Sequence, residues 1–136
     1  MNNIEIIRAI GFDWDGTLVD SMDIKSQSFA NSIIHFYPRM NGQEDVIREL
    51  YLSTRGNPRT HQLRVLQETF ELPSLSPKET QTWSNFFTSL YINQAIPLFN
   101  NAEMVVQTLK MRGYRLFLCS SVPQEDLNRT LSSYPI

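Results

Sequence analysis

A short apolar run that leads into two closely spaced aspartates most constrains how this chain can fold. Residues 4–12 (IEIIRAIGF) form a run that is too short for a helix, and their apolar residues do not recur with the helical period of 3.6. The run therefore predicts a mostly buried β-strand. Asp13, Asp15 and then Gly16 follow at once. Ligands bind at the carboxyl ends of strands in open α/β sheets, and glycine accepts the positive φ of a tight turn. Both carboxylates are therefore expected near one cavity, as ligands of a divalent cation, as a nucleophile or as an acid/base pair.

Two simpler interpretations compete for the same residues. A calcium-binding EF-hand loop counted from Asp13 needs glycine at its sixth position and an acidic ligand at its twelfth, where Leu18 and Ile24 stand. The EF-hand interpretation therefore fails. A solvated turn made of Asp and Gly accounts for the four residues 13–16 about as well as a ligand site does. It does not account for the apolar run before them or for the residues that follow.

The longer segment 13–21 (DWDGTLVDS) closely resembles the first motif of the haloacid dehalogenase-like (HAD) hydrolases, in the form found in their phosphatase and phosphomutase branch. The resemblance implies that Asp13 is the nucleophile that forms an aspartyl-phosphate and that Asp15 is the general acid/base. It also implies Mg²⁺ held by the Asp13 carboxylate and the Asp15 backbone carbonyl, with Gly16 and Thr17 in the phosphate site. The substrate so implied is a small phosphorylated metabolite.

A second strand is expected near the carboxyl end of the chain. Residues 101–112 read as a helix that ends at Gly113, with an inner face made by Val105, Val106 and Leu109. Residues 114–119 (YRLFLC) then form a strongly apolar run. The sequence therefore predicts helix, glycine and strand in succession.

Two serines directly follow that second run. Apolar residues followed by serine resemble the second HAD motif, which implies that the Ser120 hydroxyl and the Ser121 N–H hold the transferring phosphoryl group. Ser121, Pro123 and Gln124 also fit a simple helix start, with a capping box and proline at the first helical position. Both interpretations can hold together, because a helix start offers free N–H groups to an anion.

Between the two motifs, residues 21–96 contain no convincing strand and show four helical patterns. The fourth pattern has the clearest start, where Ser76, Pro77 and Glu79 combine a capping box with proline at the first helical position. We expect the apolar stripes to form a core rather than a cofactor site. The stripes are Met22, Phe29, Ile33 and Tyr37; Val46, Ile47 and Leu50; Leu63, Leu66 and Phe70; and Trp83, Phe86, Phe87, Leu90 and Tyr91.

The predicted fold class is α/β. An all-helical segment directly after the first motif resembles the small helical cap of one HAD subclass. The resemblance implies a Rossmannoid core with a parallel sheet, incomplete here, made of residues 1–20 and 97–136, and an inserted helical cap made of residues 21–96.

One arginine of the expected cap is a candidate substrate contact. Asn57 and Pro58 fit a helix N-cap and first position, which places Arg59 in the first turn beside free N–H groups. A guanidinium there is a plausible clamp for phosphate or carboxylate. The Gly56-x-x-Arg59 spacing resembles the cap specificity loop of phosphomutase-like HAD members. The alternative is a solvated surface arginine.

Composition sets the remaining expectations. Twelve basic and fourteen acidic residues give a net charge of −2 without a basic tract, so nucleic acid is not an expected partner. Cys119 is expected to be a buried, inert thiol, and His35 and His61 lack metal-ligand spacing. No signal peptide or membrane-length apolar segment is present in the sequence, so we expect a cytoplasmic protein and no membrane partner.

The 136 residues are short for the whole family pattern. The third HAD motif, a lysine, and the fourth, an acidic cluster, lie downstream of the second, but residues 122–136 hold no lysine, and Glu125 and Asp126 fit the first turn of a helix. We therefore expect the amino-terminal portion of a phosphatase, truncated before these motifs, without turnover by itself and prone to self-association through exposed sheet edges. A non-catalytic fragment or interaction module, and a phosphomutase, are the alternatives.

Overall fold

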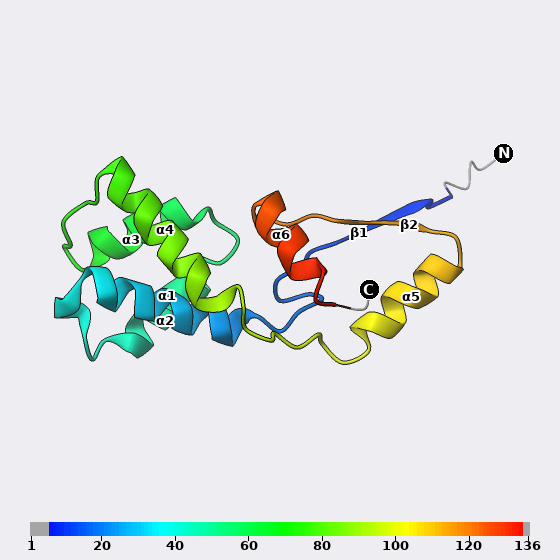
Figure 1. The fold of residues 1–136 in the computed structure, drawn as a ribbon, viewed down its shortest axis with the longest axis horizontal. Coiled ribbons are helices and arrows are strands. Elements are labelled where there is room, and N and C mark those ends of the chain that lie inside the picture. Colours follow the sequence, from blue (N-terminus) through cyan, green and yellow to red (C-terminus); the bar gives the residue numbers. More distant parts are fainter. Residues whose placement is uncertain (1–5, 135–136) are drawn as a thin grey trace. The chain divides into compact units, whose positions relative to one another are not determined.

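The computed structural model describes residues 6–134, which divide into two compact units (Figure 1). The first unit is Met1–Ser21 with Ile96–Ile136, and the second is Met22–Ala95. Each of the two boundaries between the units lies one residue from the position expected from the sequence. That the second unit works as a cap stays a prediction.

A two-stranded parallel sheet forms the centre of the first unit. Strand β1 (Ala9–Phe12) pairs with β2 (Arg115–Leu118), and the register places Phe12 opposite Leu118. Helix α5 (Ala102–Met111) precedes β2 and contacts it, and α6 (Gln124–Leu131) follows it. The predicted α/β class and parallel pairing are thus confirmed. Gly113, at φ 85°, makes the turn between α5 and β2, as the sequence predicted.

The strands are more exposed than the sequence predicted. Residues 6–8 are described outside any strand, so β1 is shorter than the expected run, and Ile6 and Ile7 are 72% and 70% exposed. Residues 4 and 5 of that run lie outside the described residues. Alternate residues of both strands are exposed, because a parallel sheet is buried only where layers cover both of its faces. Phe117 instead lays its ring over Gly11, where an added Cβ would lie 2.6 Å from the ring.

Two further burial predictions in this unit are wrong. Val105 was expected on the inner face of α5 but is 43% exposed, whereas Val106 and Leu109 are half-buried. Cys119 is exposed rather than buried, because it lies just past the end of β2 on this thinly covered sheet. Apolar patterning identified the elements correctly but overestimated how completely they are covered.

Helices make up the second unit and confirm the four predicted patterns. They are α1 (Met22–Phe36), α2 (Glu44–Ser53), α3 (Arg59–Thr69) and α4 (Pro77–Tyr91), with a 3-10 turn η1 (Pro38–Met40) that the sequence did not predict. Trp83 is fully buried, stacks on Phe87 and donates its indole N–H to Ser32 Oγ at 3.0 Å. The aromatic stripe is therefore a core, as expected. In residues 6–134 we find no helix that combines the length and apolar character needed to cross a bilayer.

This unit gives one correct prediction of a helix start and one wrong prediction of a buried residue. The Ser76 side chain accepts the Glu79 N–H, and the Glu79 carboxylate accepts the Ser76 N–H at 2.7 Å, so the predicted capping box is present. These hydrogen bonds hold the pKa of Glu79 below its ordinary value. Val46 was expected on the buried stripe of α2 but is 46% exposed, because the buried face of this helix is the narrow pair Ile47 and Tyr51.

Candidate active site

The loop after β1 folds tightly around the residue between the two aspartates. The Trp14 side chain is only 3% exposed, and its backbone carbonyl accepts the N–H groups of Leu18 at 3.0 Å and Val19 at 3.1 Å. Gly16 lies within the loop at φ 74°, which confirms the predicted positive-φ turn. Buried Trp14, Leu18 and Val19 therefore anchor a loop whose polar residues stay near the surface.

The two aspartates have different surroundings. Asp13 is exposed, and its Oδ1 accepts the Trp14 N–H at 2.8 Å. Asp15 is half-buried, and its Oδ1 accepts the hydroxyl of Ser21 at 2.7 Å. Ser21 is fully buried, so it fixes the Asp15 carboxylate from inside the unit. Ser21 is part of the sequence motif, but the sequence alone does not indicate this role. That both carboxylates face one cavity stays a prediction.

The second predicted motif lies at the same edge of the sheet as the first. Cys119 N–H donates to the Phe12 carbonyl at 2.8 Å, so Asp13 and Cys119 are the next positions in register and Ser120 lies one residue farther along. The carboxyl ends of the two parallel strands therefore bring Asp13 and Ser120 to one edge of the sheet.

The helix after Ser120 begins later than the capping interpretation required. The structure places the N-cap at Pro123 with no side-chain cap, so the predicted capping box from Ser121 is wrong. Ser120 Oγ instead accepts the Val122 N–H at 3.1 Å, because the chain makes a turn before α6. Among the described residues, neither the Ser120 O–H nor the Ser121 N–H finds an acceptor. Both donors remain available for an anion.

Gly16 and Thr17 offer less to a phosphate than the motif suggested. Gly16 N–H donates to Val19 O at 2.9 Å, and Thr17 N–H donates to Trp14 O at 3.4 Å, so the loop itself uses both donors. Thr17 is exposed and keeps its hydroxyl for other partners. The phosphate-binding role of these two residues stays a prediction.

Tyr134 is a site residue that sequence reasoning missed. Its ring meets that of Trp14 edge-on with centroids 5.2 Å apart, and its hydroxyl donates to the Ile96 carbonyl at 2.6 Å. Burial raises the pKa of the Tyr134 phenol above its ordinary value, and the charge of Asp15 raises it further. No sequence signal indicates this contact, because it joins residues far apart in the chain.

The segments that lead into and out of the helical unit are paired within the first unit. Asp20 N–H donates to Pro97 O, and Phe99 N–H donates to Leu18 O, both at 2.9 Å. The return segment 97–99 therefore braces the same loop that carries the two aspartates.

Arg59 lies in the first turn of α3, but its neighbours differ from those predicted. Asn57 is not the N-cap: that position is Pro58, and the Asn57 amide donates back to the Thr54 carbonyl at 3.1 Å, closing the turn after α2. The Arg59 guanidinium donates to Thr88 Oγ1 at 2.7 Å and to the Tyr91 hydroxyl at 3.0 Å, both on α4. These bonds give it a structural role within the helical unit, and its substrate role stays a prediction.

The donor set at the loop fits Mg²⁺ in chemical type. Asp13 and Asp15 offer carboxylate and carbonyl oxygens, which Mg²⁺ prefers, and Asp13 Oδ2 accepts no hydrogen bond from the described residues. Within residues 6–134 no third His, Cys, Asp or Glu joins them in a ligand cluster. An ion here would therefore draw its other ligands from water and phosphate oxygens, as Mg²⁺ commonly does.

The comparison with known families agrees with this geometry. Residues 7–134 match the family described as haloacid dehalogenase-like hydrolases. The chain belongs to this family. The match includes both β-strands and the loop with the two aspartates, so the family resemblance inferred from two short motifs extends over nearly all the described residues.

Two known proteins are similar to this chain over most of its length. It is 27% identical over 127 residues to pyrophosphatase PpaX from Anoxybacillus flavithermus, covering 92% of this chain and 53% of the relative. Its fold matches a predicted phosphoglycolate phosphatase from Haemophilus somnus 129PT with a TM-score of 0.71 at 20% identity, covering 96% of this chain and 58% of that one. The chain thus spans a little over half the length of each relative.

Proposed function

We propose that this HAD chain carries the nucleophile and acid/base half of a Mg²⁺-dependent phosphohydrolase site that acts on a small phosphorylated metabolite. The observation that carries the proposal is the shared sheet edge, where exposed Asp13 and the free Ser120 O–H follow adjacent parallel strands. The names of the two relatives, a pyrophosphatase and a predicted phosphoglycolate phosphatase, support phosphate esters or anhydrides as substrates.

The proposed reaction has two steps. An Asp13 carboxylate oxygen attacks phosphorus, the bond from phosphorus to the leaving oxygen breaks, and protonated Asp15 gives that oxygen its proton. Asp15, now a carboxylate, then takes a proton from water as the water attacks the aspartyl-phosphate, releasing phosphate and restoring Asp13. Asp13 suits the first role because it is exposed, and Asp15 suits the second because Ser21 fixes its carboxylate.

Charge neutralisation is the remaining requirement, because an anionic carboxylate must approach an anionic phosphate. Bound Mg²⁺ supplies it by withdrawing charge from the phosphate oxygens, and Asp13 and Asp15 are the residues that would hold the ion. We assign to Ser120 O–H and Ser121 N–H the role of donating hydrogen bonds to the same oxygens, because neither donor has an acceptor among the described residues.

The alternatives to a hydrolase are a phosphomutase and a non-catalytic module. In a phosphomutase, the aspartyl-phosphate passes its phosphoryl group to a sugar hydroxyl instead of water. In a non-catalytic module, the exposed apolar side chains of the first unit, such as Phe117, bind another chain. We favour the hydrolase because both relatives are named as phosphatases of one kind or another.

Asp13→Asn and Asp15→Asn in the natural protein that contains these residues test the proposal. Asp13→Asn should lower Mg²⁺-dependent hydrolysis of p-nitrophenyl phosphate by about 10⁴-fold, about 5 kcal/mol of barrier. Asp15→Asn should still form phosphoenzyme with this activated ester but should turn it over slowly. The control is Asp45→Asn, an exposed carboxylate of α2, which should retain activity. Full activity in Asp13→Asn would refute the proposal.

A further inference from the structure

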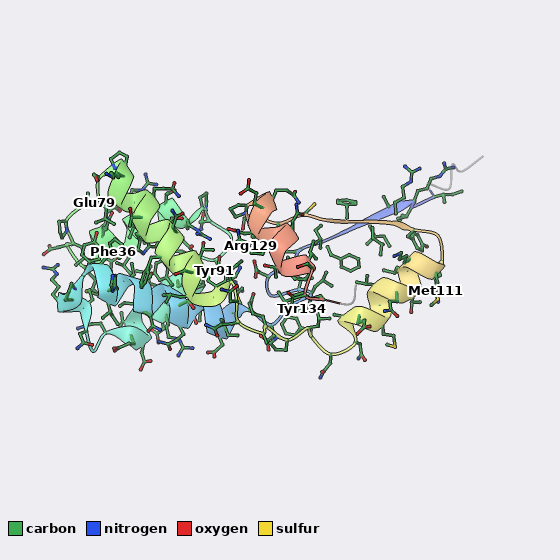
Figure 2. The ribbon with its side chains drawn as sticks, in the orientation of Figure 1. Phe36, Glu79, Tyr91, Met111, Arg129 and Tyr134 are labelled. Carbon is green, nitrogen blue, oxygen red and sulfur yellow. The ribbon has the colours of Figure 1, made fainter. Side chains whose placement is uncertain are left out.

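Tyr134 contacts the catalytic loop from a distant part of the chain. It follows α6, where its N–H donates to the Leu131 carbonyl at 3.0 Å, and Figure 2 labels its side chain next to the end of that helix. Its ring makes a T-shaped contact with the Trp14 ring, and its hydroxyl donates to the carbonyl of Ile96, the first residue after the helical unit. One side chain thus joins three segments of the first unit.

The contact with Trp14 falls at a sensitive place. Trp14 separates Asp13 from Asp15, its N–H bonds Asp13 Oδ1, and its carbonyl receives the N–H groups of Leu18 and Val19. A shift of Trp14 therefore moves the Asp13 hydrogen bond and the turn that carries Asp15 together.

We propose that Tyr134 is a positioning residue that holds the loop of Asp13 and Asp15 in place by clamping Trp14 against the return segment at Ile96. This inference rests on the function proposed for that loop. The edge-on ring packing fixes where Trp14 can lie, and the hydroxyl bond fixes the orientation of the Tyr134 ring.

The competing view is that Tyr134 only fills space in a small core. A filler would tolerate loss of its hydroxyl and would affect stability without a specific effect on the loop. Two features favour the clamp. The hydroxyl bonds a backbone carbonyl instead of solvent, and the ring meets the residue that lies between the two aspartates. Both features predict a local effect at Trp14.

The experiment compares Tyr134→Leu and Tyr134→Phe with Tyr114→Leu, which removes a half-buried phenol just before β2 in the same unit. All variants of the 136-residue chain carry Trp83→Phe, which leaves Trp14 as the only tryptophan. The readouts are Trp14 fluorescence, and deuterium exchange of the loop N–H groups that bond the Trp14 carbonyl.

Tyr134→Leu should shift Trp14 emission to the red and speed exchange of the loop N–H groups by about tenfold. Tyr134→Phe should give a smaller effect of the same kind, because it keeps the ring and loses only the Ile96 bond. Tyr114→Leu should change neither readout. If Tyr134→Leu does not fold, the Tyr134→Phe comparison alone decides, and unchanged exchange in it would overturn the proposal.

Equal effects from Tyr114→Leu would also overturn it, since they would reflect general loosening. In the natural protein, Tyr134→Leu should lower kcat more than it raises KM, because the loop acts on the reacting phosphorus. Fluorescence and exchange need no turnover. They therefore test the clamp even if Asp13→Asn shows that the proposed phosphatase function is wrong.

Discussion

Replacing Arg59 with alanine tests what the arginine of the first turn of α3 does in this structure. Its Nη1 donates to the Ser84 carbonyl at 3.1 Å and to Thr88 Oγ1 at 2.7 Å, while Nη2 donates to the Tyr91 hydroxyl at 3.0 Å. The guanidinium also lies 5.0 Å from the centroid of the Phe87 ring. Arg59 thus connects the start of α3 to three successive turns of α4. Figure 2 labels Tyr91 at the end of α4.

The expected loss follows from these contacts. Hydrogen bonds to a charged group are worth roughly 1.5–3 kcal/mol each, and a partly exposed cation–π contact about 0.5–1 kcal/mol. The bonds share one half-buried group, and its positive charge at a helix start costs roughly 0.3–1 kcal/mol, so the terms do not add in full. We expect Arg59→Ala to destabilise the helical unit by about 2 kcal/mol.

Urea unfolding followed by Trp83 fluorescence, in a Trp14→Phe background, measures this loss within the helical unit. A shift of about 1 M in the midpoint corresponds to the expected value, for a slope near 2 kcal/mol per M. Arg64→Ala is the matched control, because Arg64 is an exposed arginine of the same helix whose one side-chain hydrogen bond to the described residues is with His61. Arg64→Ala should stay within about 0.5 kcal/mol of the parent. A midpoint shift for Arg59→Ala no larger than for Arg64→Ala would refute the reasoning.

The same variant separates the structural role from the proposed substrate role. If Arg59 also holds the non-reacting end of the substrate, Arg59→Ala in the natural protein should lower kcat/KM for the natural substrate much more than for a small phosphate ester. An equal decrease of kcat/KM for both substrates would mean that Arg59 has only its structural role, through its contacts with α4. The substrate must first be found by a screen of phosphorylated metabolites.

Two other predictions follow from individual side chains. The Tyr37 phenol donates a hydrogen bond to Pro73 O and accepts one from Gln67. Burial raises the pKa of this phenol in the folded protein above its ordinary value of 10.0. The protonated phenol therefore stabilises the fold fully below pH 10.0, and this stabilisation is lost as pH rises through the higher pKa of the folded state. Urea midpoints should therefore fall above a pH of about 10, and Tyr37→Phe should flatten that fall. We also expect residues 1–136 to bind a hydrophobic dye and to elute in gel filtration as more than a monomer, because Met111 and Phe117 are 81% and 51% exposed. Met111→Lys should reduce both effects, and a monomer without dye binding would contradict the expectation.

The sequence predicted most successfully where local chemistry decides the structure. Ser76 and Glu79 form a capping box with residues only three positions apart, and Gly113 supplies a positive φ that other residues adopt at a cost. The apolar runs before Asp13 and Ser120 include the paired parallel strands, as expected for runs that are too short and too weakly periodic for a helix.

The wrong predictions concern properties that depend on neighbours distant in sequence. Val46 and Val105 fit apolar stripes, but periodicity gives the direction of a face and not the width that other elements cover. Asn57 has the right residue type for an N-cap, yet its amide bonds Thr54 behind it, because the chain turns at Gly56 with φ 85°. Tyr134 could not be found from sequence, because its role depends on a contact with Trp14 that only the fold creates.

The two segments that connect to the helical unit are paired with each other, and this pairing affects how freely the residues between them can change. Asp20 bonds Pro97 and Phe99 bonds Leu18, so the first unit holds both ends of the helical insertion together. Loop-closure entropy grows slowly, by about 0.6 kcal/mol for each doubling of length, so residues between those ends can change at little cost to the core. The loop of Asp13 and Asp15 lies outside those residues, and the N–H groups of Leu18 and Val19 bond the Trp14 carbonyl within it, so a change of length there would disturb the first unit directly.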